Sequence, residues 1–164
     1  MATVTKKSTD HETNTRSTAA SRVILVVAED NRFQDTLVEI LREEGYSILA
    51  VTSTASAHDA LHKTPPSLVV LDSMISDGMD FCRWLRSSGE MAHVPILMIV
   101  PNEREGMYLE SQGIRVDDAI LKPLHREELQ ACVRTLLRRR RPQQEAETFK
   151  TAESLEGDRI QESS

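Results

Sequence analysis

Four charged side chains stand at the ends of apolar segments, and their types suit metal and phosphoryl chemistry. Glu29 and Asp30 follow one such segment. Asp72 ends a second, and Lys122 follows a third. Carboxylates that converge without a cation repel one another, so a cluster of them requires a hard divalent ion such as Mg²⁺. Together with a lysine, such a cluster would form a site for a phosphoryl group.

These side chains converge only if the segments that carry them are neighbouring parallel strands. Ser67–Leu71 and Arg22–Ala28 are largely apolar and show no polar alternation, which predicts strands buried on both faces. Val94–Val100 has the same character, and Ser47–Val51 and Val116–Leu121 are shorter candidates. The carboxyl ends of such parallel strands form the rim at which ligands bind.

Helical segments alternate with the five predicted strands. The helix that ends at Gly45 repeats apolar residues at helical spacing, namely Phe33, Leu37, Ile40 and Leu41. The clearest helical period in the chain is at Leu129, Cys132, Val133, Leu136 and Leu137. Five strands alternating with five helices predict a (βα)5 doubly wound parallel α/β sheet with the flavodoxin-like strand order 2-1-3-4-5.

The composition limits the class of protein. The chain has 164 residues, enough for one domain, and its formal charge of −6 argues against a general nucleic-acid-binding protein. Cys82 and Cys132 stand alone, which predicts thiols in a reducing compartment. No apolar run approaches the roughly 18 residues of a membrane span, so we expect a cytoplasmic protein without membrane contact.

The two ends differ from the middle of the chain. Residues 1–21 are rich in serine and threonine and poor in core-forming side chains, which predicts a disordered tail. Residues 140–164 begin with arginines and continue as an acidic, polar stretch, which predicts a second disordered tail. The folded domain is therefore expected to span residues 22–139, with its output through protein contacts.

Four segments together resemble the receiver domain of bacterial two-component response regulators. They are LVVAEDN at 25–31, LVVLD at 68–72, PILMIV at 95–100 and DDAILKPL at 117–124. Each is weak alone, but their order and spacing follow the family's pattern. The resemblance implies a component of a phosphorelay rather than an enzyme, with at most its own phosphorylation and dephosphorylation as activities.

The resemblance also implies a role for each site residue. Asp72 would accept a phosphoryl group from the phosphohistidine of a sensor histidine kinase or phosphotransfer protein. Glu29 and Asp30 would hold Mg²⁺ with Asp72. The main-chain carbonyl of Met74 would be a further ligand, and Lys122 would pair with the phosphoryl oxygens.

The acidic pair has two alignments with the family. Counting back from Gly45 without a gap places the pair at Ala28 and Glu29, whereas the string EDN favours Glu29 and Asp30. Glu29 belongs to both alignments. A metal ligand at Glu29 is therefore expected whichever alignment holds.

Three positions depart from the family's pattern. Val100 stands where the family has a serine or threonine at the end of the fourth strand, and valine cannot hydrogen-bond a phosphoryl group. Ala119 stands where the family has its switch aromatic, three residues before Lys122. The turn after Asp72 is shorter than the family's and has Ser76 in place of its usual proline.

Two functions are compatible with these residues. The first is a receiver that signals to a downstream protein partner through the face of its fourth helix, fifth strand and fifth helix, with a homodimer through that face as one option. The alternative is a pseudo-receiver, a phosphorylation-independent protein-interaction module, which the residues at Val100 and Ala119 favour. Neither requires direct contact with nucleic acid.

Two further groups have less specific interpretations. His58 and His62 are four residues apart on a predicted helix, a spacing that can bind zinc, but no third ligand is evident. We therefore expect them on an exposed helix face. Asp117 and Asp118 are expected to be solvated loop residues.

Overall fold

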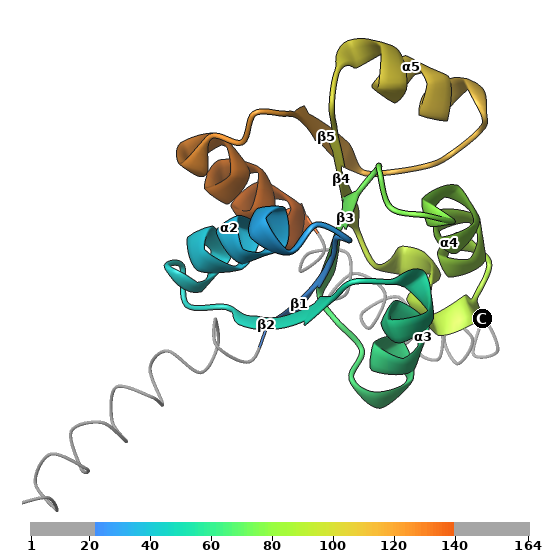
Figure 1. Ribbon diagram of the computed structural model, residues 1–164. Coiled ribbons are helices and arrows are strands. Elements are labelled where there is room, and N and C mark those ends of the chain that lie inside the picture. The colour runs from blue at the N-terminus through green and yellow to red at the C-terminus, as the bar shows by residue number, and fades with distance from the viewer. Residues whose placement is uncertain (1–21, 140–164) are drawn as a thin grey trace, which may run out of the picture.

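Five parallel strands form one sheet in the computed structural model, which describes residues 22–139 (Figure 1). They are β1 (Val23–Val27), β2 (Ser47–Val51), β3 (Leu68–Asp72), β4 (Ile96–Val100) and β5 (Asp118–Leu121). The strand order is β2-β1-β3-β4-β5, so the predicted doubly wound α/β fold is confirmed. The tails predicted at residues 1–21 and 140–164 lie outside the described residues.

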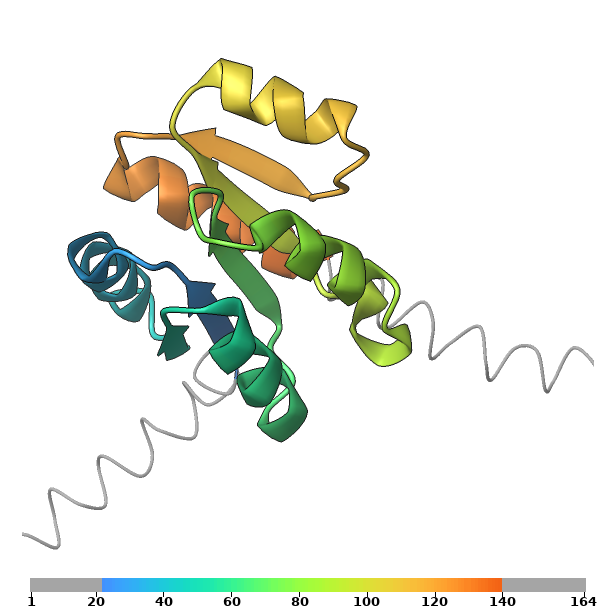
Figure 2. The same ribbon diagram turned by 45° about the vertical axis from the view of Figure 1, so that its right-hand side comes forward.

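Helices cover both faces of the sheet (Figures 1 and 2). α2 (Asn31–Arg42) packs on one face beside the helix of residues 126–139. The opposite face carries α3 (Thr54–Lys63), α4 (Gly78–Arg86) and α5 (Glu103–Ser111), and a short 3₁₀ helix, η1 (Gly89–His93), precedes β4. Within residues 22–139, no helix combines the length and the apolar character that crossing a membrane requires.

The three inner strands divide the core into two layers. Along β1, Ile24 and Val26 pack with α2, whereas Leu25 and Val27 pack with α3 and α4. Every residue of β3 and β4 is buried, as expected for strands covered on both faces. β2 and β5 form the edges and are more exposed. The burial of the apolar runs therefore places the end of β3 in the middle of the sheet.

Short polar side chains fix the start of three helices on the rim where the strands end. Asp30 Oδ1 accepts the Phe33 N–H at 3.1 Å and caps α2. Ser53 caps α3 through the Ser56 N–H at 3.0 Å, and Asn102 caps α5 in the same way. These caps satisfy backbone donors that a helix leaves unpaired, and they fix where each helix leaves the rim.

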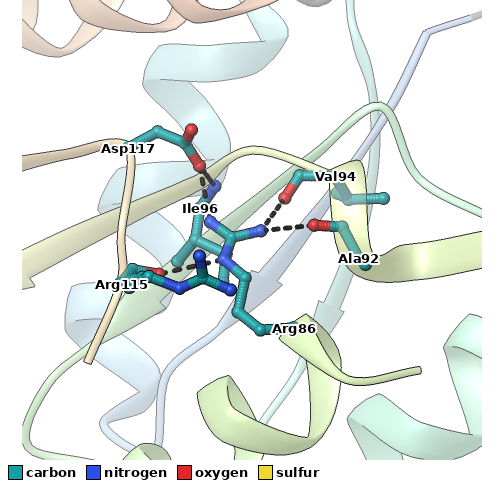
Figure 3. A network of polar contacts seen from close by, with 6 residues as sticks. All are labelled: Arg86, Ala92, Val94, Ile96, Arg115 and Asp117. Atoms are coloured by element: carbon teal, nitrogen blue, oxygen red, sulfur yellow. Dashed lines mark hydrogen bonds and ion pairs between the residues drawn. The ribbon is translucent and has the colours of Figure 1, made fainter. Parts of the chain in front are cut away.

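At the ends of the strands opposite to this rim, Arg86 joins α4 to the segments that lead into β4 and β5 (Figure 3). Its guanidinium donates to three backbone carbonyl oxygens at 2.8 to 3.1 Å, those of Ala92, Val94 and Arg115. It also pairs with Asp117 Oδ2 at 2.7 Å, and the same oxygen accepts the Ile96 N–H at 2.7 Å. We call this set the Arg86–Asp117 network. Asp117 is an exposed loop residue, as expected, but its carboxylate also pairs with a guanidinium and a strand N–H, which the sequence did not indicate.

The strands β4 and β5 begin later than the apolar runs that predicted them. β4 starts at Ile96 rather than Val94, and β5 starts at Asp118 rather than Val116. Pro95 has no N–H to donate, and the first N–H of β4 is bound by the Asp117 side chain instead of a neighbouring strand. At the start of β4, the Asp117 carboxylate thus takes the place of a strand carbonyl as the acceptor of the Ile96 N–H.

Both cysteines carry thiols that resist ionisation. Burial raises the pKa of Cys82 to about 11. The pKa of Cys132 is raised to about 12, chiefly by burial and further by a hydrogen bond that its Sγ donates to Asp118 Oδ2 at 3.1 Å. Asp118, which we expected to be a solvated loop residue, is instead the first residue of β5 and accepts this bond.

Candidate functional site

Asp72 is a buried carboxylate at the carboxyl end of the central strand. Its side chain is 5% exposed. It lies on β3 opposite Ile99 of β4, one position beyond the pair that Val27 of β1 makes with Leu71. The Met74 N–H donates to Asp72 Oδ1 at 3.1 Å and so fixes the orientation of the carboxylate. Because a buried charge requires a partner, the surroundings of Asp72 must supply a cation.

Lys122 supplies that cation from the end of β5, which β4 separates from β3 in the sheet. Its Nζ lies 3.3 Å from Asp72 Oδ1 and 3.4 Å from Asp72 Oδ2. Its backbone N–H donates to the Val100 carbonyl oxygen at 2.8 Å, which fixes the exit of the chain from β5. The structure therefore brings together two of the residues predicted to share the rim, although they are far apart in the sequence.

Phe33 also contacts the lysine, and no pattern in the sequence indicated this contact. Lys122 Nζ lies over the Phe33 ring, 4.3 Å from its centroid. Phe33 is in the first turn of α2 and is half-buried against the core on that face. In the sequence it appeared only as a core-facing helix position, since nothing local distinguishes a ring that meets a cation from one that fills a core.

Glu29 and Asp30 leave β1 beside the buried carboxylate, and both are exposed. Because Val27 pairs with Leu71, the continuing register brings Ala28 next to Asp72. Glu29 follows one residue later. Asp30 uses Oδ1 to cap α2, so one of its carboxylate oxygens already accepts a backbone hydrogen bond, and it differs in this from Glu29.

A magnesium site built from these residues would use few protein ligands. Within residues 22–139, no three His, Cys, Asp or Glu side chains gather closely enough to hold a metal ion. Mg²⁺ keeps several waters and is commonly bound by one or two carboxylates plus phosphate oxygens. The hard oxygen donors of Glu29 and Asp72, with one exposed and one buried carboxylate at the same rim, fit that requirement.

Two of the positions that depart from the family's pattern lie near this rim without adding polar groups. Val100 is buried at the end of β4, beside Leu121 of β5. Ala119 is an exposed residue of β5 and presents no ring. Together with α5 they line a cavity of about 690 Å³. Leu109 is the buried residue of α5.

The turn after Asp72 contains a polar atom that the sequence did not single out. The Ser73 hydroxyl is buried and has no hydrogen-bond partner among the described residues. Met74, next in the chain, is 59% exposed. Asp77 has a φ of 62° in the left-handed region and precedes Gly78, where α4 begins. The turn thus presents an exposed thioether two residues after Asp72.

The histidines of α3 take no part in this site. His58 packs edge-on against Trp84, with ring centroids 4.2 Å apart, and against Phe81 at 5.3 Å. His62 is exposed. Only the second histidine therefore matches the expected exposed helix face, because the first belongs to an aromatic cluster between α3 and α4.

The chain is similar to proteins of two-component signalling. Residues 24–134 match the response regulator receiver domain family. The transcriptional regulatory protein GltR of Pseudomonas aeruginosa is 33% identical over 123 residues, which cover 74% of this chain and 51% of that protein. The response regulator MprA of Mycobacterium tuberculosis is 34% identical over 128 residues, which cover 77% of this chain and 55% of that protein.

A solved structure shares the fold. The crystal structure of a two-component response regulator from Clostridium difficile is 27% identical with a TM-score of 0.64, and the match covers 72% of this chain and 97% of that one. The chain spans about half the length of the curated relatives that it matches. From the family match and the shared fold, we conclude that the chain belongs to the response regulator receiver domain family of two-component systems.

Proposed function

We propose that this receiver domain accepts a phosphoryl group on Asp72 from the phosphohistidine of a sensor histidine kinase or phosphotransfer protein. The observation that carries the proposal is the buried Asp72 carboxylate with Lys122 Nζ within 3.4 Å of both its oxygens. A nucleophilic carboxylate beside a fixed cation suits an acceptor of a negatively charged group. We place this reaction in the cytoplasm.

The transfer uses the Asp72 oxygen that has fewer partners. Oδ1 accepts the Met74 N–H, so we expect Oδ2 to attack the phosphorus. The O–P bond forms as the P–N bond breaks, and the electron pair of that bond returns to the imidazole nitrogen. Negative charge then moves from the carboxylate to the phosphoryl oxygens, and the Lys122 ammonium is near enough to follow it.

Magnesium would be held by Glu29, Asp72 and the main-chain carbonyl of Met74. When bound, the ion neutralises charge on the phosphoryl oxygens. We do not propose Asp30 as a magnesium ligand, although it lies next to Glu29, because one oxygen of its carboxylate caps α2. This choice favours the alignment in which the first position of the acidic pair is Ala28.

The modified domain would signal through the face formed by α5, β5 and the helix of residues 126–139. Exposed apolar side chains support a protein partner on α5 and β5: Met107, Tyr108 and Leu121. A downstream protein or a second copy of the chain fits such a surface. We propose no direct contact with nucleic acid for this domain.

The proposal is tested by adding Mg²⁺ and then acetyl phosphate or a phosphoramidate, with intact mass and amide NMR as readouts. We expect one added phosphoryl group, which EDTA prevents, and amide shifts that begin at the rim. Failure to gain mass would overturn the proposal. The alternative, a phosphorylation-independent module, fails if the modification changes partner affinity by the roughly 1 to 3 kcal/mol typical of allosteric coupling.

Met74 should lengthen the lifetime of the acyl phosphate. In this family, the residue two positions after the acceptor lines the path of the hydrolytic water, and a thioether does not hold water as an amide does. We expect the phosphorylated wild type to lose phosphate a few times more slowly than Met74→Asn. The measurement is the decay of phosphorylated protein by intact mass after removal of the donor; faster decay in the wild type would contradict the prediction.

A further inference from the structure

One ammonium group in the site has two partners of different chemistry. Lys122 Nζ contacts both oxygens of Asp72 and lies 4.3 Å from the centroid of the Phe33 ring. The lysine side chain is 28% exposed, and that of Asp72 is 5% exposed. Attraction between a cation and an aromatic face grows as water is removed, so this contact is stronger here than on an open surface.

Phe33 is held more rigidly than the lysine that it contacts. Its backbone N–H is bound by the Asp30 cap in the first turn of α2, and its ring packs against the core on that face. Lys122, by contrast, leaves the end of an edge strand on a side chain with several rotatable bonds. The ring therefore restricts where the ammonium can lie.

We propose that Phe33 is a positioning residue that holds the Lys122 ammonium over Asp72. The proposal rests on the proposed function, in which Lys122 must follow charge from the carboxylate to the phosphoryl oxygens. A ring face attracts the cation without being a second anion, so it retains Lys122 in the site without competing with the phosphoryl group for the ion pair. Phe33 itself touches neither the carboxylate nor the incoming group in this scheme.

Three variants separate positioning from packing. Phe33→Leu keeps an apolar side chain and removes the ring, whereas Phe33→Tyr keeps the ring. Tyr46→Leu is the matched control, because Tyr46 is also half-buried against the same core but lies where β2 begins, at the opposite end of α2. Thermal denaturation of all three variants reports the cost of lost packing.

The first readout needs no phosphorylation. The ε-methylene protons of Lys122 should show an upfield ring-current shift in the wild type, Phe33→Tyr and Tyr46→Leu. We expect Phe33→Leu to lose that shift. An unchanged Lys122 shift in Phe33→Leu would overturn the proposal, even if the protein is phosphorylated normally.

The second readout is the rate of phosphorylation by acetyl phosphate with Mg²⁺. Phe33→Leu should slow it about five-fold, the size expected for loss of a partly desolvated cation–π contact, and Phe33→Tyr should restore it. An equal fall in the phosphorylation rate of Tyr46→Leu would overturn the proposal, since lost packing would then explain the slower rate in both variants. If no form of the protein takes up phosphate, the proposed function fails, and the ring-current shift still decides whether Phe33 holds Lys122.

Discussion

Asp72→Asn should abolish the uptake of phosphate from acetyl phosphate or a phosphoramidate. The amide oxygen of asparagine is a poor nucleophile and carries no charge, so it can neither attack phosphorus nor form the mixed anhydride. We expect the variant to show no added phosphoryl group by intact mass under conditions in which the wild type is modified. The fold should persist, because the asparagine replaces a side chain of nearly the same shape.

Asp77→Asn is the control for this experiment. Asp77 is an exposed acid five residues further along the same turn, and its side chain makes no capping hydrogen bond. Its left-handed φ of 62° is one that asparagine also adopts. This variant should therefore be phosphorylated like the wild type. Phosphate on Asp72→Asn, at any other side chain, would disprove the assignment of the acceptor.

Arg86→Met should lower the free energy of unfolding by about 3 kcal/mol, because it removes the hydrogen bonds that the guanidinium donates to Ala92, Val94, Arg115 and Asp117, each of which contributes roughly 0.5 to 1.5 kcal/mol. The change leaves the carboxylate of Asp117 without its cation and three carbonyl oxygens without a donor. For a domain of this size, that loss corresponds to a fall in the melting temperature of roughly 10 °C. Urea denaturation followed by circular dichroism measures both the midpoint and the slope.

Arg83→Met is the comparison for this stability experiment. Arg83 lies one turn earlier on α4 and is exposed. It makes longer contacts, 3.4 Å to Asp80 and 3.3 Å to the Gln112 carbonyl oxygen. Exposed pairs of this kind contribute little, so we expect a loss below about 1 kcal/mol. Similar losses for Arg83→Met and Arg86→Met would show that the Arg86–Asp117 network does not stabilise the fold.

The sequence was sufficient for the fold because its strongest signals are local. Runs such as Val69–Leu71 and Leu97–Ile99 lack polar residues, and this property follows directly from burial on both faces. The alternation of strands with helices then predicts a parallel sheet with right-handed crossovers. The starts of β4 and β5 were harder to delimit, since the first N–H of β4 is bound by a side chain from elsewhere in the chain, that of Asp117.

The site was only partly predictable, because its contacts join distant positions. Asp72 and Lys122 could be paired in advance because both end strands of one parallel sheet, and strand ends share a rim. Phe33 and Arg86 could not, since each has an unremarkable helical position and its partner depends on how helices pack on the sheet. The difference between Glu29 and Asp30 likewise appeared only once the start of α2 was known.

The protonated thiols make this domain suitable for site-specific labelling. Cys82 and Cys132 are the two cysteines of the chain, and with pKa values of about 11 and 12 they are almost entirely thiols at neutral pH. Maleimides react with the thiolate, so both native side chains should be modified slowly. A cysteine introduced at the exposed Met107 on α5 would therefore carry a fluorophore or spin label without removal of the native cysteines.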